Sequence, residues 1–223
     1  MSPLLDPQRS NMDQHRLKFV PHFNASEPLV AAAWVHMKII AAHCKNPEII
    51  FDIGANVGVY SCIFATKYPR AVVYAFEPVP TTYTVLQKNI KANGLEKHIV
   101  AHNFALWSKT GRVNMGMPDN RDQRNSGLFS AYHTDNQVEI MAIPLDSALN
   151  VKPDFIKIDV EGAEAEVIKG GMRKFTAAKT IYIERGKQPI PGAPLYREVE
   201  KLLKTAGLER KAEGHDEIWT RVN

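Results

Sequence analysis

The chain has only two cysteines, no long apolar run and no visible secretory signal. Cys44 and Cys62 lack the paired spacing of a disulfide or zinc framework, so buried thiols in a reducing compartment are expected. The longest apolar stretch, residues 29–44, is too short to span a membrane and is interrupted by two histidines and a lysine. The first 22 residues are polar and contain three prolines, unlike a signal peptide. We therefore expect a cytoplasmic protein without membrane contacts.

Several signatures of catalysis and of nucleic-acid binding are also missing. The sequence contains no nucleophile elbow around a serine or cysteine, no CxxC pair, no HExxH helix and no phosphate-binding loop before Lys67. Basic residues outnumber acidic ones by only 28 to 24 and form no run, so nothing indicates a nucleic-acid tail. The 223 residues, 44% of them hydrophobic, suffice for one soluble α/β domain with a sizeable core.

The most informative feature is a glycine-containing turn after a short apolar run. Residues 49–53 have the length and composition of a strand, and Gly54 and Gly58 then lead into a helical stretch. A second apolar run, residues 71–76, ends in Glu77, 19 residues after the second glycine. Such a βαβ unit is typical of nucleoside binding. Gly54 lets the backbone approach the ligand, Gly58 lets the helix sit against the strand, and Glu77 accepts two ribose hydroxyls.

The spacing of this turn selects the kind of nucleoside. A dinucleotide fingerprint reads G-x-G-x-x-G, whereas Ala55 and Asn56 stand here where the middle glycine belongs. Asp52 at the head of the loop repels a pyrophosphate and suits a cationic or zwitterionic ligand. S-adenosylmethionine carries an ammonium and a sulfonium and no phosphate. The sequence therefore predicts a methyl-donor site, in preference to a dehydrogenase or a nucleotide-free domain.

Strand-like and helix-like segments alternate along the rest of the chain. The expected helices occupy residues 26–44, capped by Ser26, and then 60–68, 81–92, 163–175 and 196–206. After the two strands of the opening unit, further strands are expected at residues 99–104, 154–159 and 180–184, with a terminal hairpin at 208–222. This order predicts a mostly parallel sheet with helices on both faces and an antiparallel last strand.

Two regions lie outside this regular alternation. Residues 111–117 and 138–143 alternate in polarity and predict an antiparallel pair around a polar loop at 118–136, typical of a lid or binding loop. Residues 1–47 are interpreted as a lead-in and a helix that covers the substrate side. The remainder, 48–223, is interpreted as the donor-binding domain. His36 and His43 in the first helix are expected to pack or to be solvated.

Candidate site residues follow from the rule that ligands lie beyond the carboxyl ends of parallel strands. Lys157 and Asp159 fall on the same side of the fourth predicted strand, and Glu161 follows in the next turn. We expect Asp159 beside the methyl group, where it orients the acceptor or removes its proton, with His133 of the polar loop as an alternative base. Asp159, Glu161 and Glu184 also offer oxygens to a divalent cation, but no spacing is diagnostic of a metal.

The ends of the second and third predicted strands supply the remaining candidates. Pro78 follows the predicted ribose ligand, Glu77. The third strand ends in Asn103, Phe104 and Ala105, and Asn103 either bonds the adenine edge or simply ends the strand.

Several of these motifs occur in the same order in the FkbM family of methyltransferases, which the chain resembles over about residues 48–185. The most distinctive match is KIDVEGAE at residues 157–164, and the others are residues 52–58, 75–78, 89–94, 104–106 and 144–146. The resemblance implies a class I methyltransferase fold, a Rossmann-like three-layer sandwich with a seven-stranded sheet whose last strand is antiparallel. It also implies S-adenosylmethionine as cofactor.

The resemblance further implies a function and a set of contacts. Most often the family methylates a hydroxyl on a sugar or natural product, and some relatives methylate peptide amide nitrogens. By position, the adenine would face residues 103–105, the ribose Glu77, and the methionine end Asp52, Gly54, Asn56 and Gly58. Ser126 and Gly127 match a small-residue step that touches donor or acceptor. The helix with two histidines before the first strand departs from the family, so the resemblance does not imply which acceptor this chain methylates.

Two other functions remain as alternatives. A ribose 2′-O-methyltransferase acting on RNA would place lysines and acids around the methyl group, as Lys157, Asp159, Glu184 and Lys187 can. The scattered basic residues and the lack of an aromatic and basic strip argue against it. A catalytically silent nucleoside-binding scaffold is the other, and intact Asp159 and Glu161 argue against that. The sequence leaves the acceptor, the need for metal and the oligomeric state open.

Overall fold

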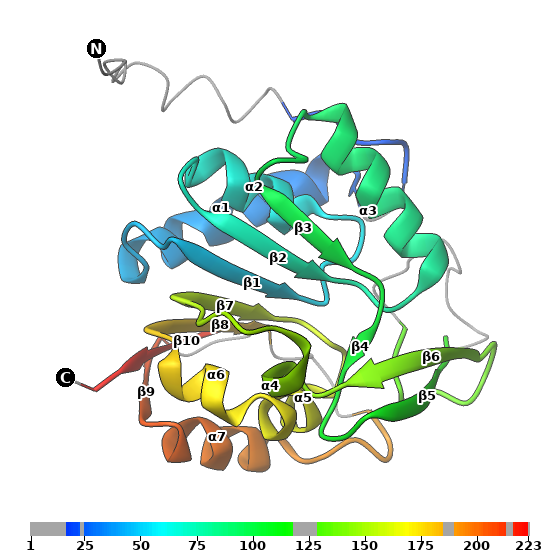
Figure 1. Cartoon of the computed structure of the whole chain (residues 1–223), viewed down its shortest axis with the longest axis vertical. Coiled ribbons are helices and arrows are strands. Elements are labelled where there is room, and N and C mark those ends of the chain that lie inside the picture. The colour runs from blue at the N-terminus through cyan, green and yellow to red at the C-terminus, as the bar shows by residue number, and fades with distance from the viewer. Residues whose placement is uncertain (1–16, 23–24, 118–128, 185–189, 213–215, 223) are drawn as a thin grey trace.

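The computed structural model describes residues 17–22, 25–117, 129–184, 190–212 and 216–222. Within these residues the chain forms a three-layer sandwich with a seven-stranded sheet in the middle (Figure 1). The strands of this sheet are β1 (Ile49–Ile53), β2 (Val72–Phe76), β3 (Ile99–His102), β7 (Phe155–Ile158), β8 (Thr180–Glu184), β9 (Leu208–Ala212) and β10 (Asp216–Arg221). Helices α1 (Glu27–His43), α2 (Val59–Lys67) and α3 (Pro80–Ala92) cover one face, and α4 (Leu145–Ala148), α5 (Glu164–Gly170), α6 (Met172–Ala177) and α7 (Tyr196–Thr205) cover the other.

The strand order is β3-β2-β1-β7-β8-β10-β9. Five neighbouring strands run parallel from β3 to β8, and β10 is antiparallel to both β8 and β9. The order reverses between β1 and β7, which is where open α/β sheets bind ligands. The predicted fold, with seven strands and an antiparallel last strand, is confirmed.

The central strands are apolar because helices cover both of their faces. All four residues of β7 are buried, as are the last four of β1. One hydrophobic cluster fills the space between the sheet and α1–α3, and a second fills the space between the sheet and α5–α7. The charged residues within these strands, Asp52 and Lys157, are partners in the β1–β7 register. The sheet therefore buries two charges at the switch in strand order, and they face each other.

The helix ends show how local signals act. Pro28 stands in the first turn of α1, as predicted, and the Ser26 carbonyl accepts two backbone N–H groups of that turn. Ser26 is the N-cap residue, as predicted, but its side chain makes no capping bond to the described first turn. At Gly170 and Gly171 the helix expected at residues 163–175 divides into the separate helices α5 and α6.

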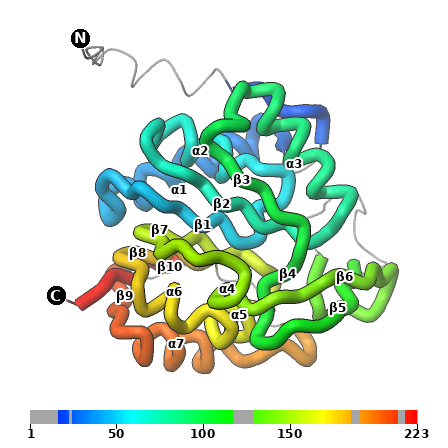
Figure 2. Tube along the Cα trace, in the orientation of Figure 1, coloured from blue at the N-terminus to red at the C-terminus, as the bar shows by residue number. Residues whose placement is uncertain are grey.

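A small second sheet lies beside the carboxyl edge of the large one. Its strands are β4 (Ala105–Leu106), β5 (Gly111–Met115) and β6 (Val138–Ile143), in the order β4-β6-β5. The antiparallel pairing of β5 with β6 confirms the predicted pair. The third strand is shorter than predicted, because the chain leaves the large sheet after His102 and joins the small one as β4 (Figure 2).

The described part of the lead-in is attached to α3. The Asn89 carboxamide accepts the Val20 N–H and donates to the Val57 carbonyl, both at 2.7 Å. Asn93 makes a similar pair of bonds to Lys18. These two asparagines therefore tie residues 18–20 to the helix next to the glycine loop. Helix α1 packs on α2 and reaches β10, and the division of the chain at residue 47 stays a prediction.

None of the helices that the structure describes is both long and apolar enough to cross a membrane.

Candidate active site

The glycine loop between β1 and α2 is fixed by the backbone around it. The N–H groups of Gly54 and Ala55 donate to the last carbonyl of β2, at 3.0 and 2.9 Å. Gly54 has a φ of +78°, and a Cβ there would lie 1.7 Å from the carbonyl oxygen of Asp159. Gly58 has a φ of +88°, and its Cβ would lie 2.4 Å from Leu86 of α3. Both positions therefore require glycine, and at Gly58 the neighbour that a side chain would strike belongs to α3. That Gly58 lets the following helix sit against the strand stays a prediction.

A buried ion cluster lies beneath this loop. The Lys157 ammonium lies 3.5 Å from Asp52 Oδ1 and 3.3 Å from Asp159 Oδ2. It also lies 4.8 Å from the centre of the Tyr60 ring, a cation–π distance. The Ser61 hydroxyl donates to the other Asp52 oxygen at 2.5 Å. Burial lowers the pKa of Lys157, but the charges of Asp159 and Asp52 outweigh burial and hold that pKa above its ordinary value.

The position of Asp52 differs from the sequence interpretation. Its side chain is fully buried and lines neither of the pockets described below. Its carboxylate balances the charge of Lys157 and so fixes that side chain under the loop. The direct contact between Asp52 and a ligand stays a prediction.

Glu77, which follows β2, is held by two backbone donors. Its Oε2 accepts the Asn56 N–H and its Oε1 accepts the Val79 N–H, each at 2.9 Å. The residue is only 6% exposed, and burial raises the pKa of its carboxyl to about 7, although the two N–H bonds lower it. Each carboxylate oxygen has a further lone pair, so Glu77 can accept two more hydrogen bonds.

Glu77 and Asp159 line a polar pocket at the carboxyl ends of β1, β2 and β7. It encloses about 410 Å³ of empty space, including its open mouth. Its walls are Gly54, Asn56, Glu77, Pro78, Val79, Met115, Phe129, Asp159, Val160 and Glu161. Three acidic residues therefore line one pocket, together with Gly54 and Asn56 of the glycine loop. This pocket suits a ligand with hydroxyls and positive charge.

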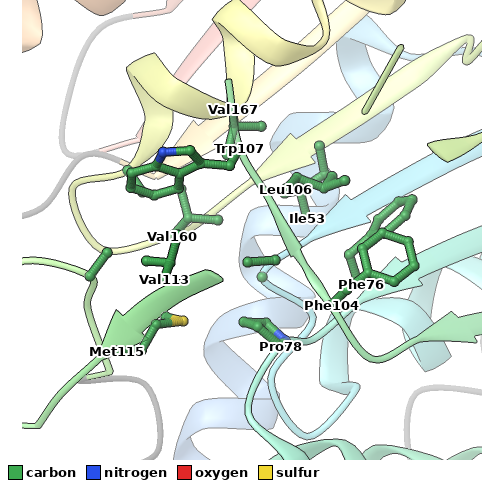
Figure 3. Close-up of a pocket in the computed structure, with 14 residues that line it drawn as sticks. Ile53, Phe76, Pro78, Phe104, Leu106, Trp107, Val113, Met115, Val160 and Val167 are labelled. Carbon is green, nitrogen blue, oxygen red and sulfur yellow. The ribbon is translucent and has the colours of Figure 1, made fainter. Parts of the chain in front are cut away.

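An apolar pocket of about 390 Å³ adjoins it, with Gly54, Pro78, Met115 and Val160 in both walls. Figure 3 shows Val113 and Met115 of the small sheet on one side and Phe76 and Phe104 on the opposite side. The other lining residues are Ile53, Ala105, Leu106, Trp107, Ala131, Ala163 and Val167. A flat aromatic group fits such walls better than a charged one.

Asn103 follows β3 and lies beside the residues that follow β2. Its amide Nδ2 donates to the carbonyls of Glu77 and Pro78, both at 2.9 Å. The side chain thus fixes the backbone that follows β2, and its bond to an adenine edge stays a prediction. Its neighbours Phe104 and Ala105 line the apolar pocket.

Two glutamates beside Asp159 have unusual ionisation. Glu161 has a φ of +49° in the turn after β7, and burial with the charges of Asp159 and Glu184 raises its pKa to about 8. Glu184 ends β8, and the charge of Asp159, followed by burial, raises its pKa to about 8 as well. Such values favour proton exchange near neutral pH.

Sequence reasoning missed a polar cluster behind these acids. The hydroxyls of Tyr60 and Tyr182 lie 2.6 and 3.1 Å from Nδ1 of His36, whose Nε2 lies 3.4 Å from the Asp216 carboxylate. The four residues come from α2, β8, α1 and β10. Strand alternation does put Tyr182 on the same face as Glu184. No local pattern indicates that His36, Tyr60 and Asp216 join Tyr182. His36 packs, as one of the two expectations had it, and His43 is exposed.

Several candidates lie elsewhere. His133 follows the turn at Ser130 and is not among the residues that line either pocket. Ser126, Gly127 and Lys187 lie outside the described residues. Among the residues that are described, no three histidine, cysteine or acidic side chains form a group suited to a metal ion.

The strand order, the glycine loop at the switch point and the acid after β2 define a Rossmann-like methyltransferase. The sequence profile of the family described as "Methyltransferase FkbM domain" matches residues 52–210. The chain therefore belongs to the FkbM family of methyltransferases, and the predicted family is confirmed.

Individual relatives give the same class. The chain is 28% identical over 179 residues to the hexuronic acid methyltransferase AglP of Haloferax volcanii, covering 77% of this chain and 68% of that protein. It is 27% identical over 176 residues to the 2-O-methyltransferase NoeI of Sinorhizobium fredii, covering 70% of each. A crystal structure of an FkbM methyltransferase from Methylobacillus flagellatus superposes with a TM-score of 0.55 at 17% identity, covering 78% of this chain and 44% of that one. That structural likeness shows the fold alone.

Proposed function

We propose that this methyltransferase transfers a methyl group from S-adenosylmethionine to an oxygen of a sugar or other small natural product. The observation that carries the proposal is the pair of adjoining pockets at the carboxyl ends of β1 and β2. One is apolar and the other carries three carboxylates, so together they match an adenosyl group attached to a cationic chain.

The described residues fit this donor in three ways. The Glu77 carboxylate, already oriented by two N–H groups, accepts the two ribose hydroxyls. Phe104, Pro78 and Val160 enclose the adenine. Gly54 leaves the loop backbone close to Asp159, whose carboxylate balances positive charge. S-adenosylmethionine supplies an electrophilic methyl group, and every other task falls to the protein.

Two observations support an oxygen acceptor in place of a phosphate-bearing ligand or a nucleic acid. The names of the relatives AglP and NoeI refer to a hexuronic acid and to 2-O-methylation. The polar pocket also lacks cationic side chains among its described lining residues, so it does not match a polyphosphate. Sugars present hydroxyls that carboxylates bind well, and Glu184, beside Asp159, offers one next to this pocket.

Formation of S-adenosylhomocysteine tests the proposal. The purified protein is incubated with S-adenosylmethionine and, separately, with neutral methyl glycosides, uronic acids, short peptides and RNA. We expect S-adenosylhomocysteine to form with a glycoside or a uronic acid. It should not form with the Glu77→Ala variant. Turnover only with peptide or RNA contradicts the sugar or natural-product acceptor, and no binding of the donor contradicts the whole proposal.

A further inference from the structure

We propose that Glu184 takes the proton from the acceptor, whereas Asp159, fixed by Lys157, acts only as the negative partner of the donor's sulfonium. This inference rests on the proposed function, and it assigns a base that the sequence placed elsewhere. Two carboxylates in one site then have separate tasks because their surroundings differ.

The position of Glu184 relative to the donor pocket is the first argument. The polar pocket lies over β1, β2 and the turn after β7, and Asp159 is its wall toward β8. The β7–β8 register pairs Ile158 with Ile183, so the next residues, Asp159 and Glu184, lie side by side. Glu184 does not line the donor pocket and stands on the far side of Asp159 from β1. With the sulfonium of the proposed donor in the polar pocket and its methyl group directed toward β8, in-line transfer brings the acceptor oxygen from this far side.

The distribution of positive charge is the second argument. The Lys157 ammonium lies 3.3 Å from Asp159 and is itself fully buried. A carboxylate beside a cation is a weaker base than one beside other carboxylates, because the cation favours the ionised form. Glu184 instead faces the like charges of Asp159 and, across the β8–β10 register, Asp216. The charge of Asp159, burial and the charge of Asp216 raise the pKa of Glu184 to about 8, although Lys157 lowers it, and this value is close to the one that suits a base at neutral pH.

Other ionisable groups also face this position. They are Lys157 of β7, Asp159 and Glu161 of the turn after β7, Asp216 of β10, Tyr60 of α2 and, behind Asp216, His36 of α1. Glu161 is the closest rival, since its pKa is raised to about 8 too. However, Glu161 lines the donor pocket, and a base on the donor side cannot reach an oxygen that attacks from the opposite direction.

The acceptor oxygen forms its bond to the methyl carbon while the carbon–sulfur bond breaks, and the sulfur keeps the electron pair. The hydroxyl proton moves to the Glu184 carboxylate, which becomes neutral and later returns the proton to solvent.

Calorimetry of donor binding tests the assignment without any acceptor. S-adenosylmethionine and S-adenosylhomocysteine differ by one methyl and one positive charge, and proton release is obtained by titrating each into the enzyme in two buffers of different ionisation enthalpy. A sulfonium beside Asp159 favours the ionised form of Glu184, which neighbours Asp159, and of Glu161, which lines the donor pocket. Near pH 7.5 we therefore expect S-adenosylmethionine to release about half a proton more from Glu184 than S-adenosylhomocysteine does, if the charge lowers the pKa of Glu184 by about one unit.

Three variants give the matched comparison, each checked for folding by its melting temperature. Glu184→Gln should lower the extra proton release, and Glu161→Gln should remove only the share that comes from the carboxyl lining the donor pocket. Asp159→Asn should instead remove the preference for the charged donor. Loss of the release in Glu161→Gln with retention in Glu184→Gln overturns the assignment, as does an unchanged release in both. Absence of donor binding in the wild-type enzyme contradicts the proposed function instead.

A glycoside or other acceptor identified by the product assay allows a second readout. Glu184→Gln should lower kcat about 100-fold with the KM for S-adenosylmethionine little changed, which is within the usual range for loss of a general base. The rise of kcat with increasing pH, which ionisation of Glu184 produces in the wild type, should be absent in this variant. Equal kcat and an unaltered pH profile in this variant exclude the base role.

Discussion

The donor side and the acceptor side of the sheet use carboxylates in opposite ways. On the donor side, Glu77 accepts two backbone N–H groups and Asp52 is bonded to Ser61 and Lys157. On the acceptor side, Glu184 stands beside the like charge of Asp159, which together with burial raises its pKa to about 8. Groups that bind are thus oriented in advance by their neighbours, whereas groups suited to proton exchange are crowded by negative charge.

The largest expected effect is on the ion cluster that joins the two sides. Lys157→Met leaves Asp52 without its cation inside the protein. We expect the free energy of unfolding to fall by about 3–5 kcal/mol, measured by denaturant titration. Lys169→Met is the control, because its partners Glu166 and Glu198 are at the surface and such pairs contribute about 1 kcal/mol or less. Equal losses in the two variants would contradict a buried cluster.

The next effect sharpens the donor side. Glu77→Ala removes the acceptor of two ribose hydroxyls, so the affinity for S-adenosylhomocysteine should fall by about 100-fold, equivalent to about 2–3 kcal/mol. Calorimetry measures it. Glu139→Ala removes an exposed carboxylate on β6 and should bind as the wild type does. An affinity for Glu77→Ala within twofold of the wild type removes Glu77 from the ribose site.

The pH dependence of donor binding follows from the same carboxyl. Because the pKa of Glu77 is raised to about 7, its carboxyl is protonated in the free protein below that pH. This protonation stabilises the folded protein, and the stabilisation is lost as pH rises toward 7. Ribose hydroxyls donate to the ionised form. The affinity for S-adenosylhomocysteine should therefore decline by about tenfold per pH unit below 7 and level off above it.

Two comparisons check this dependence. Titrations of the wild type between pH 5.5 and 8 should show the slope, and the same series with Glu77→Gln should be flat, since a carboxamide does not ionise. A wild-type affinity that does not change below pH 7 is the contrary result.

The smallest expected effect concerns the cluster behind the acceptor side. His36→Phe removes bonds to Tyr60 and Tyr182 and the pair with Asp216, so unfolding should require about 1–2 kcal/mol less. His43→Phe, on the exposed side of the same helix, should change stability by less than about 0.5 kcal/mol. Thermal unfolding of both variants measures the difference, and similar melting temperatures would contradict a structural role for His36.

The same two sides differ in how far the sequence predicts them. The donor side is built from segments close in the chain, so the glycine spacing and Glu77 predict a switch-point pocket with glycine-loop and acidic walls. Local patterns do not reveal which atoms exclude a side chain, and the clash at Gly58 comes from Leu86 of another helix. Nor do they reveal the burial of Asp52, which depends on Lys157 about a hundred residues later.

The end of β7 and the polar cluster behind it could be predicted only in part. KIDVEGAE places Lys157, Asp159 and Glu161 at the end of a strand, and the structure confirms that placement. The link from His36 to Tyr182 spans 146 residues and four elements, and no periodicity encodes it. Ser126, Gly127 and Lys187, which the sequence singled out, lie outside the described residues.

A crystal structure with S-adenosylhomocysteine tests the central claim most directly, because the claim is about where an adenosyl group lies. The account predicts both ribose hydroxyls within hydrogen-bond distance of Glu77, the adenine between Pro78 and Phe104, and the sulfur on the β1 side of Asp159. An adenosine bound anywhere else, or a ribose that does not touch Glu77, would contradict it.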